Sequence, residues 1–190
     1  ILAFPTAGAA GVLPGVIYGA RERFGLNKEQ MVQMMLTASA IGIVIANTAT
    51  LSGAAGGCQA EVGSASAMAA AALTEVRGKS PETALHGASI ALKNMIGLAC
   101  DPIGGLVEVP CIKRNGVAAV FSMSASDMAY LGIESFVPFD EVVKAMREVG
   151  DMMSPKIRET ALGGLATTPT GQKVAKKMGL LKIGSNPCSN

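Results

Sequence analysis

The amino-acid sequence predicts an all-α protein, a compact helical bundle with buried central helices and short irregular loops that carry the cysteines. Apolar residues recur at helical spacing in several long segments. The one segment that alternates as a strand does, GLVEVPCI, is too short to make a sheet. Frequent Gly, Ala and Ser residues within the predicted helices favour close approach of their backbones.

The first long helix is predicted over residues 26–46. Asn27 is its expected N-cap, and Gln30 completes a capping-box pattern. The apolar residues that follow are typical of a helix that is amphipathic or fully buried, and its methionines are expected in the core. These apolar residues are Met31, Met34, Met35, Ala38, Ile41 and Ile45.

Two further helices are predicted in the middle of the chain. Residues 61–78 are rich in alanine and end at Gly78, where a C-terminal glycine cap is expected. Residues 80–100 begin with Ser80 as the cap and Pro81 in the first turn. This second helix places Cys100 at a helix end.

The C-terminal third contains additional helix signals. Residues 117–132 indicate another buried helix, and Asp140 is expected to cap a helix over 141–153. Two more short helices are predicted where a Ser or Thr precedes a proline, at Ser154–Pro155 and at Thr168–Pro169.

The size and cysteine usage favour one reduced domain. A chain of 190 residues can bury a sizeable core without disulfides. Four widely spaced cysteines in an alanine- and methionine-rich sequence do not resemble a small secreted scaffold, so we expect a cytoplasmic protein. The chain begins with Ile1 inside what already looks like a motif, so we also expect that an N-terminal portion is missing. Residues 1–179 would form the main domain and residues 180–190 a C-terminal tail.

Charge and composition argue against two classes of partner. The net charge is +2, basic residues form no long tract and aromatic residues are few, so nucleic acid is not expected. No charged residue occurs between Glu29 and Glu61, which is long enough to span a bilayer. Only residues 34–46 of that interval are mostly apolar, and polar residues and glycines follow. We therefore expect a buried helix and no membrane span.

Three cysteines lie in contexts that favour a thiolate. Cys58 follows a glycine pair and precedes a predicted helix start. Cys100 precedes the turn sequence DPIGG, and Cys111 precedes Lys113 and Arg114. The spacing matches neither a ferredoxin run nor a zinc ribbon, because no C-x-x-C pair occurs. An enzymic cluster with one open iron, a zinc site and plain buried thiols all fit this pattern.

Three stretches carry a resemblance to a known family. They are PTAGAAGVLPG at 5–15, SGAAGGCQAEVGSASAMAAAAL at 52–73 and, above all, KNMIGLACDPIGGLVEVPCIKRN at 93–115. The chain resembles the α chain or α domain of the iron-sulfur-dependent bacterial L-serine dehydratases from about residue 5 to about residue 179. That family converts L-serine to pyruvate and ammonia with a [4Fe-4S] cluster.

The resemblance implies that Cys58, Cys100 and Cys111 bind three irons of the cluster. The fourth iron would act as a Lewis acid on the hydroxyl group of the substrate, since hydroxide is a poor leaving group. A base must also remove the weakly acidic α-proton. Elimination would give aminoacrylate, which becomes an imine and is hydrolysed.

The resemblance also implies residues near the substrate. Thr6, Ala7 and Gly8 match a segment that the family uses there, although a plain N-terminal cap is the alternative. Ser52 is expected to support the cluster or the amino acid. Asp101 is expected to orient a ligand or the substrate amine, or else to cap its own turn.

Two residues have separate expectations. In some family members a C-terminal cysteine occupies the fourth iron of the resting enzyme, and Cys188 is the candidate here, although two residues follow it. The alternative is a solvated tail thiol. The single histidine, His86, is expected to be an ordinary, partly exposed residue and not the base.

The family's serine- and histidine-bearing segment belongs to a β chain or β domain, and no such segment occurs in this sequence. The chain is therefore expected to be incomplete alone and to work in an oligomer with a β partner. Two other hypotheses are a non-catalytic helical module whose cysteines bind zinc or only pack, and a membrane helix bundle.

Overall fold

The computed structural model describes residues 3–180, and the predicted all-α class is confirmed. Across this span the sole β-type pairing is an isolated parallel bridge between Cys100 and Arg158. The α-helices are α1 (Val12–Phe24), α2 (Lys28–Thr48), α3 (Gly53–Gly56), α4 (Ser64–Val76), α5 (Pro81–Lys93), α6 (Cys111–Tyr130), α7 (Phe139–Met152) and α8 (Pro169–Lys177). Short turns of 3₁₀ or π type are η1 (Ala7–Ala9), η2 (Gln59–Gly63), η3 (Ile103–Gly105), η4 (Pro155–Ile157) and η5 (Gly164–Thr167).

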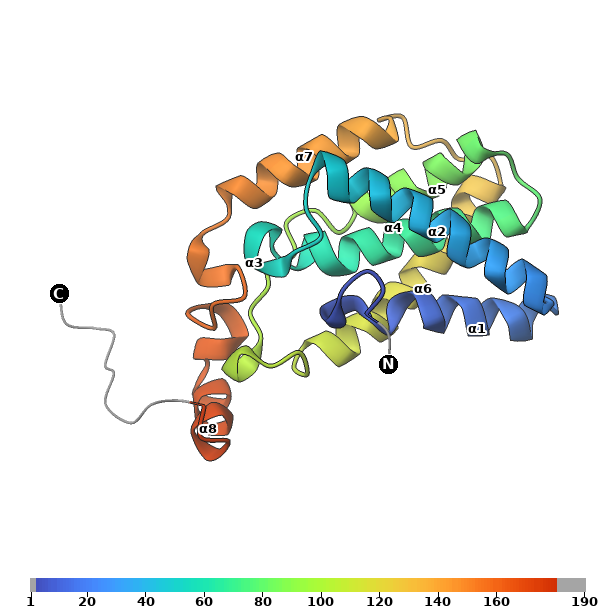
Figure 1. Cartoon of the computed structure of the whole chain (residues 1–190). Coiled ribbons are helices and arrows are strands. Elements are labelled where there is room, and N and C mark those ends of the chain that lie inside the picture. The colour runs from blue at the N-terminus through green and yellow to red at the C-terminus, as the bar shows by residue number, and fades with distance from the viewer. Residues whose placement is uncertain (1–2, 181–190) are drawn as a thin grey trace.

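Helix α4 is the centre of the bundle. It packs against α1, α2, α5 and α6, which surround it on all sides (Figure 1). Every residue from Ser64 to Thr74 is buried, and most of them are alanines. Small side chains allow the neighbouring backbones to approach closely, so this alanine-rich segment forms the buried central helix that the sequence predicts.

Several predicted helix starts are confirmed. Asn27 and Gln30 form a capping box at the start of α2. Ser80 accepts a hydrogen bond from the Thr83 backbone N–H at the start of α5, and Thr168 caps α8 in the same way. The prediction for α7 is wrong by two residues, because Pro138 takes the N-cap position. Asp140 therefore lies in the first turn of that helix, where its charge favours the helix dipole.

Helix α2 is amphipathic and lies at the side of the bundle. Met34, Ala38, Ile41 and Ile45 are buried, whereas Met35 is 44% exposed, so its expected place in the core is wrong. Within residues 3–180, α2 alone has the length and apolar composition to cross a membrane, and 28% of its most apolar window is buried. Core helices of soluble proteins and signal sequences share this length and apolar composition. These properties are therefore weak evidence that α2 crosses a membrane.

The two helices that flank the cysteine loop differ from their predicted bounds. Helix α5 ends at Lys93, so Cys100 does not lie at a helix end but in an extended segment paired with Arg158. Helix α6 begins at Cys111, six residues before the predicted start. Residues 94–110 thus form an irregular connection between α5 and α6, as expected for a cysteine-bearing loop.

The segment after α7 folds back onto this loop. Cys100 N–H donates to the Ile157 carbonyl at 2.8 Å, and Glu159 N–H donates to the Cys100 carbonyl at 2.7 Å. Further along, η5 and α8 pack against η3. The C-terminal segment therefore holds the Cys100 loop in place, and Figure 1 shows it at the end of the bundle nearest α3 and the start of α6.

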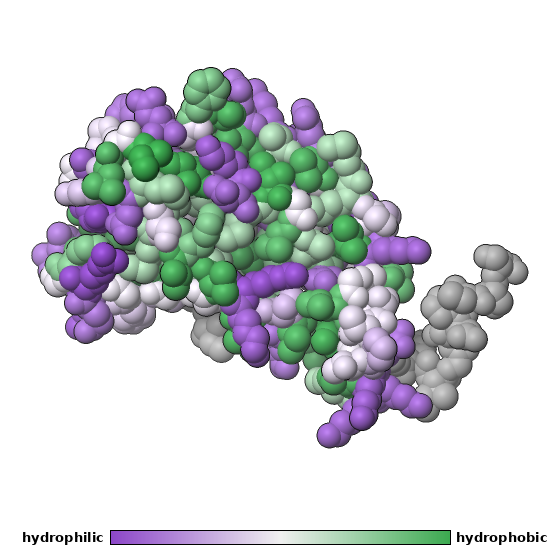
Figure 2. All heavy atoms as spheres, turned by 180° about the vertical axis from the view of Figure 1, so that it is seen from behind, coloured by the Kyte–Doolittle hydropathy of each residue, from purple (hydrophilic) through white to green (hydrophobic). Residues whose placement is uncertain are grey.

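One face of the bundle is markedly apolar. Seen from behind, hydrophobic residues gather over the middle of the surface, with polar residues around them (Figure 2). Helix α6, which lies at the back in Figure 1, contributes exposed Ile112, Val117 and Val120. Contiguous exposed apolar surface of this kind is typical of interaction sites.

Candidate functional site

Three buried cysteines from three segments lie together at one end of the bundle. Cys58 is 0% exposed, Cys100 2% and Cys111 4%, and all three are free thiols. Cys58 directly precedes η2, Cys100 lies in the bridge to Arg158, and Cys111 is the first residue of α6. The ionisation of each thiol depends on a neighbouring cysteine, so the structure brings these three predicted ligands together.

The pKa values of the three thiols are shifted in different directions. Hydrogen bonding from the Cys100 thiol, helped by the nearby Arg114 guanidinium, lowers the pKa of Cys58 below its ordinary value. The pKa of Cys100 is strongly raised, because its proton is engaged with Cys58 and the thiol is buried. Burial also raises the pKa of Cys111. Cys58 is therefore the thiol poised to become a thiolate.

The turn that carries Cys58 depends on a glycine before it. Gly57 has φ +76°, and a Cβ atom there would lie 3.0 Å from the Leu98 carbonyl and 2.5 Å from Met153 Sδ. The Gln59 N–H donates to the same Leu98 carbonyl at 3.0 Å. This close approach brings the Cys58 turn against the segment that leads to Cys100.

Gln59 joins the Cys58 turn to two other parts of the fold. Its Nε2 donates to the Met146 carbonyl on α7 at 2.8 Å, and its Oε1 accepts from the Gly97 N–H at 2.9 Å. The side chain is 0% exposed. Because buried amides are stable only when they are hydrogen-bonded, this residue orients the turn between α7 and the Cys100 loop.

Arg114 and Asp101 connect the Cys100 and Cys111 segments. Arg114 Nη1 donates to the Ala99 carbonyl at 2.8 Å, and Nη2 pairs with Asp101 Oδ1 at 3.0 Å. Asp101 Oδ2 accepts the Leu165 N–H at 2.8 Å. Both carboxylate oxygens of Asp101 are thus engaged by the protein, and the residue helps to hold the C-terminal segment on the loop.

Asn115 joins α6 to the N-terminal turn. Its Nδ2 donates to the carbonyls of Gly8 and Cys111, both at 2.7 Å, and its Oδ1 accepts the Gly11 N–H at 2.8 Å. The residue is 8% exposed. It therefore sets the position of the Thr6–Gly8 segment relative to Cys111.

Glu61 is a buried carboxylate at the centre of this arrangement. It lies in the π turn η2, three residues after Cys58, and is 8% exposed. A Cβ atom on Gly8 would clash with Glu61 Oε2, and one on Gly53 would lie 2.8 Å from the same oxygen and 3.1 Å from Cys100 Sγ. The missing side chains of these two glycines therefore make the space that the carboxylate occupies beside the thiols.

Two of the predicted substrate residues lie at this carboxylate. Gly8 touches it, and Thr6 Oγ1 lies beside it but is buried without a hydrogen bond of good geometry to any residue in 3–180. Ala7 is exposed in η1. Ser52 is also exposed and precedes α3 without a side-chain cap, one residue before Gly53.

Two further predicted residues lie elsewhere. Cys188 falls outside the residues that the structure describes. His86 is half-buried on α5, where its Nδ1 accepts the Ser135 N–H at 3.3 Å. This engagement agrees with the expectation of an ordinary structural histidine.

The three thiols suit a multi-iron cluster better than a single metal ion. Among residues 3–180, no three His, Cys, Asp or Glu side chains converge as ligands of a single ion. A four-iron cluster binds each thiolate on a separate iron and accepts sulfurs that are farther apart. Three buried free thiols from three segments, with the Thr6 hydroxyl buried nearby beside Glu61, fit such a group.

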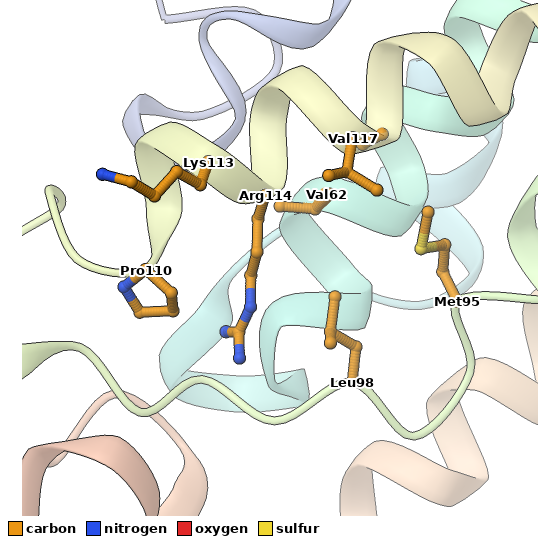
Figure 3. A pocket seen from close by; sticks show the side chains of 8 residues that line it. Val62, Met95, Leu98, Pro110, Lys113, Arg114 and Val117 are labelled. Carbon is orange, nitrogen blue, oxygen red and sulfur yellow. The ribbon is translucent and has the colours of Figure 1, made fainter.

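A shallow apolar pocket of ≈ 270 Å³ lies next to the site (Figure 3). Val62, Met95, Leu98 and Val117 form its walls, and Arg114 extends along it while Lys113 points away. None of the three cysteines lines it. The pocket is therefore a surface hollow beside α6 and is not the place where the thiols meet.

Three polar residues of the site, Gln59, Glu61 and Asn115, were not predicted from the sequence, whereas Arg114 was expected as a positive charge close to Cys111. Gln59 and Glu61 stand inside GGCQAEVG, where they are polar residues close to a cysteine in a segment that is otherwise small or apolar. That contrast is a signal of a buried polar network and could have identified them.

The whole chain was also compared with known proteins. The family model described as serine dehydratase alpha chain matches residues 1–166. The chain is 54% identical over 178 residues to the probable L-serine dehydratase alpha chain of Bacillus subtilis, covering 94% of this chain and 59% of the relative. It is 51% identical over 176 residues to the L-serine dehydratase alpha chain of Peptoniphilus asaccharolyticus, covering 93% and 60%.

A third relative is covered more fully. The probable L-serine dehydratase alpha chain of Latilactobacillus sakei is 48% identical over 178 residues, covering 94% of this chain and 84% of the relative. The chain thus spans about three fifths of the length of the first two relatives and most of the third. The match to the family model, which covers all three cysteines, places this chain in the serine dehydratase alpha chain family.

Proposed function

We propose that this chain is the cluster-bearing α part of an L-serine dehydratase, which converts L-serine to pyruvate and ammonia. The observation that supports this most strongly is the meeting of three buried thiols, from segments far apart in the sequence, beside one buried carboxylate. Cys58, Cys100 and Cys111 would hold a [4Fe-4S] cluster. When bound, this group supplies a Lewis-acidic iron that stabilises the departing hydroxyl of the substrate.

Other residues of the chain would hydrogen-bond the substrate or position the cysteine ligands. Thr6 Oγ1 is a buried hydroxyl free to hydrogen-bond an incoming polar group. Arg114 holds the Cys100 and Cys111 segments in register and favours the Cys58 thiolate. Burial of the three thiols and of Glu61 keeps water away from them, which strengthens the electrostatic contacts that they make.

A β chain or domain is part of this proposal. The relatives from Bacillus subtilis and Peptoniphilus asaccharolyticus are named as alpha chains of the enzyme. The elimination needs a base at the α-proton, and the single histidine of this sequence accepts a hydrogen bond in a loop contact on α5. We propose that the partner supplies the base and that the assembly works in the cytoplasm.

Anaerobic reconstitution of the chain, produced together with its β partner, tests this function. The expected result is a brown protein with about four irons and four sulfides per α chain and L-serine-dependent formation of pyruvate. Replacement of Cys58, Cys100 or Cys111 by serine should abolish both the iron content and the activity. Cys188→Ser is the matched control and should keep the cluster.

Two other results would contradict the proposed function. A colourless wild-type complex that still forms pyruvate, or full activity in all three cysteine variants, would refute a role for the cluster. Stoichiometric zinc with no pyruvate formation would favour the zinc-binding module instead.

A further inference from the structure

We propose that the Glu61 carboxylate is the group that binds the α-ammonium of the amino-acid substrate. This inference rests on the proposed function and adds a residue to its substrate site. It follows from three features of Glu61: its position among the thiols, its lack of a cationic partner among the described residues, and the glycines that line its oxygens.

The position of Glu61 is central. Among residues 3–180, it is the one carboxylate within electrostatic reach of Cys58, Cys100 and Cys111 together. A Cβ atom on Gly53 would lie 2.8 Å from Glu61 Oε2 and 3.1 Å from Cys100 Sγ, so the carboxylate and this thiol border the same glycine. A substrate that places its hydroxyl group at this end of the thiol cluster would therefore bring its amine to the same carboxylate, because only two carbons separate the two groups in serine.

Glu61 has no compensating charge in the described part of the chain. Residues 3–180 contain two ion pairs, Arg77–Asp127 and Arg114–Asp101, and neither involves it. Two arginines lie near the thiols. Arg114 is already used by Asp101 and the Ala99 carbonyl, and Arg158, which is bridged to Cys100, donates to the Ala55 carbonyl at 3.2 Å and forms no ion pair within this span. Burial raises the pKa of Glu61, as expected for a carboxylate without a partner. Buried charges in proteins are normally paired, so the site is complementary to a cation from outside.

The surroundings of Glu61 restrict what that cation can be. Gly8 and Gly53 contact its carboxylate on two sides, and the unpartnered Thr6 hydroxyl lies beside it. The two glycines place no side chain over these oxygens and approach them closely, so a small group with several N–H donors is the cation that suits them. An ammonium group has three donors, which matches the free lone pairs of the carboxylate and of the threonine.

The other nearby carboxylates, Asp101 and Glu159, are less suited to bind the ammonium group. Both oxygens of Asp101 are occupied by Arg114 and by the Leu165 N–H. Glu159 is close enough to raise the pKa of Glu61, but its backbone is held at φ +64° by the bridge to Cys100 and it is half-buried at the edge of the site. A bound ammonium would relieve the repulsion between Glu61 and Glu159 as well.

The test uses the complete enzyme, reconstituted anaerobically with its β partner, and the variant Glu61→Gln, which keeps size and removes charge. Two non-reacting probes separate the parts of the substrate. L-Alanine keeps the ammonium and lacks the hydroxyl, whereas 3-hydroxypropionate keeps the hydroxyl and lacks the ammonium. Binding of each is followed by the change it causes in the electron paramagnetic resonance spectrum of the reduced cluster.

In Glu61→Gln we expect the affinity for L-alanine and the KM for L-serine to worsen by at least about tenfold, as for loss of a charge-assisted contact. The affinity for 3-hydroxypropionate should change by less than about twofold. Glu61→Asp, which keeps the charge, should bind L-alanine more tightly than Glu61→Gln. The exposed Glu22→Gln on α1 is the matched control and should behave as the wild type.

Equal weakening of both probes, or no weakening of L-alanine, would overturn the inference. Loss of iron from Glu61→Gln and Glu61→Asp alike would also overturn it, because Glu61 would then serve the cluster and not the amine. Failure of the proposed function is seen separately, since the wild-type complex would then lack iron or pyruvate formation.

Discussion

The Asn115 side-chain amide donates a hydrogen bond to the Gly8 carbonyl at 2.7 Å and joins two parts of the chain that are 107 residues apart. The same amide group donates to Cys111, and its oxygen accepts from Gly11. One side chain thus sets the N-terminal turn against the helix that begins with a cysteine. The site therefore depends on contacts that are remote in sequence.

Replacing Asn115 with alanine should destabilise the fold by about 2–4 kcal/mol, because three hydrogen bonds are lost and buried backbone groups lose their partners. Urea unfolding measures the effect. Asn47→Ala, whose amide makes one exposed contact within α2, is the control and should cost less than about 1 kcal/mol. Equal effects in the two variants would contradict a bridging role for Asn115.

Replacing Gly53 with alanine should damage the thiol site. The added Cβ would lie 2.8 Å from Glu61 Oε2 and 3.1 Å from Cys100 Sγ, so one of these groups must move. We expect a loss of about 1–3 kcal/mol in stability and at least about a twofold loss of bound iron after reconstitution. Gly19→Ala on α1 meets no atom within 4 Å and should be neutral or slightly stabilising. Normal iron content in Gly53→Ala would contradict the role of Gly53 in making room for Glu61 and Cys100.

Replacing Arg114 with lysine should loosen the link between the Cys100 and Cys111 segments. A lysine lacks the planar fork that reaches the Ala99 carbonyl and Asp101 together. We expect the free energy of unfolding to fall by about 1–2 kcal/mol, because one hydrogen bond is lost at a partly exposed site. Urea unfolding of the variant and of Arg21→Lys, an exposed arginine on α1, distinguishes the specific effect from a general one. Arg114→Lys should lower the free energy of unfolding more than Arg21→Lys does, and equal values would contradict the proposed link.

The stability of the cluster-free chain should depend on Glu61 and on pH. Burial raises the pKa of Glu61 in the folded chain, so folding favours the protonated acid. This contribution is fully present below the unfolded pKa and is lost as the pH rises through the folded pKa. The glutamine side chain does not titrate, so Glu61→Gln should gain stability relative to the wild type as the pH rises from about 4 to about 8. A pH-independent difference in urea unfolding would show that the carboxyl is not perturbed.

The helices of the bundle were predictable because their signals are local. The Asn27 capping box, the Ser80–Pro81 start and the alanine-rich stretch that becomes α4 each follow from residues within one or two turns. The start of α7 was misplaced because Pro138 competes with Asp140 for the first positions of the helix. Local patterns do not decide between two adjacent start signals.

The contacts of the site were less predictable. The resemblance pointed to the three cysteines, and local context suggested that each favours a thiolate. The structure shows that only Cys58 has a lowered pKa, because one thiol proton is shared with Cys100 and burial acts on the others. Sharing of this kind depends on distances between remote segments, and no sequence pattern encodes it.

The bridge that holds Cys100 was also beyond the sequence pattern. A helix over residues 80–100 was plausible from its apolar spacing, but the chain leaves the helix at Lys93. The extended segment that follows is stabilised by Ile157 and Glu159, about sixty residues later. Tertiary pairing overrides local propensity at this point.

The wide π turn between Cys58 and α4 fixes the rotational position of the thiol segment relative to the central helix. Five residues, Gln59 to Gly63, form this turn before regular winding resumes at Ser64. Deleting a single residue there would rotate everything on the thiol side by about 100° relative to the alanine face that packs in the bundle. Evolution can therefore exchange many side chains around this turn, but its length in residues should be among the least variable quantities of the chain.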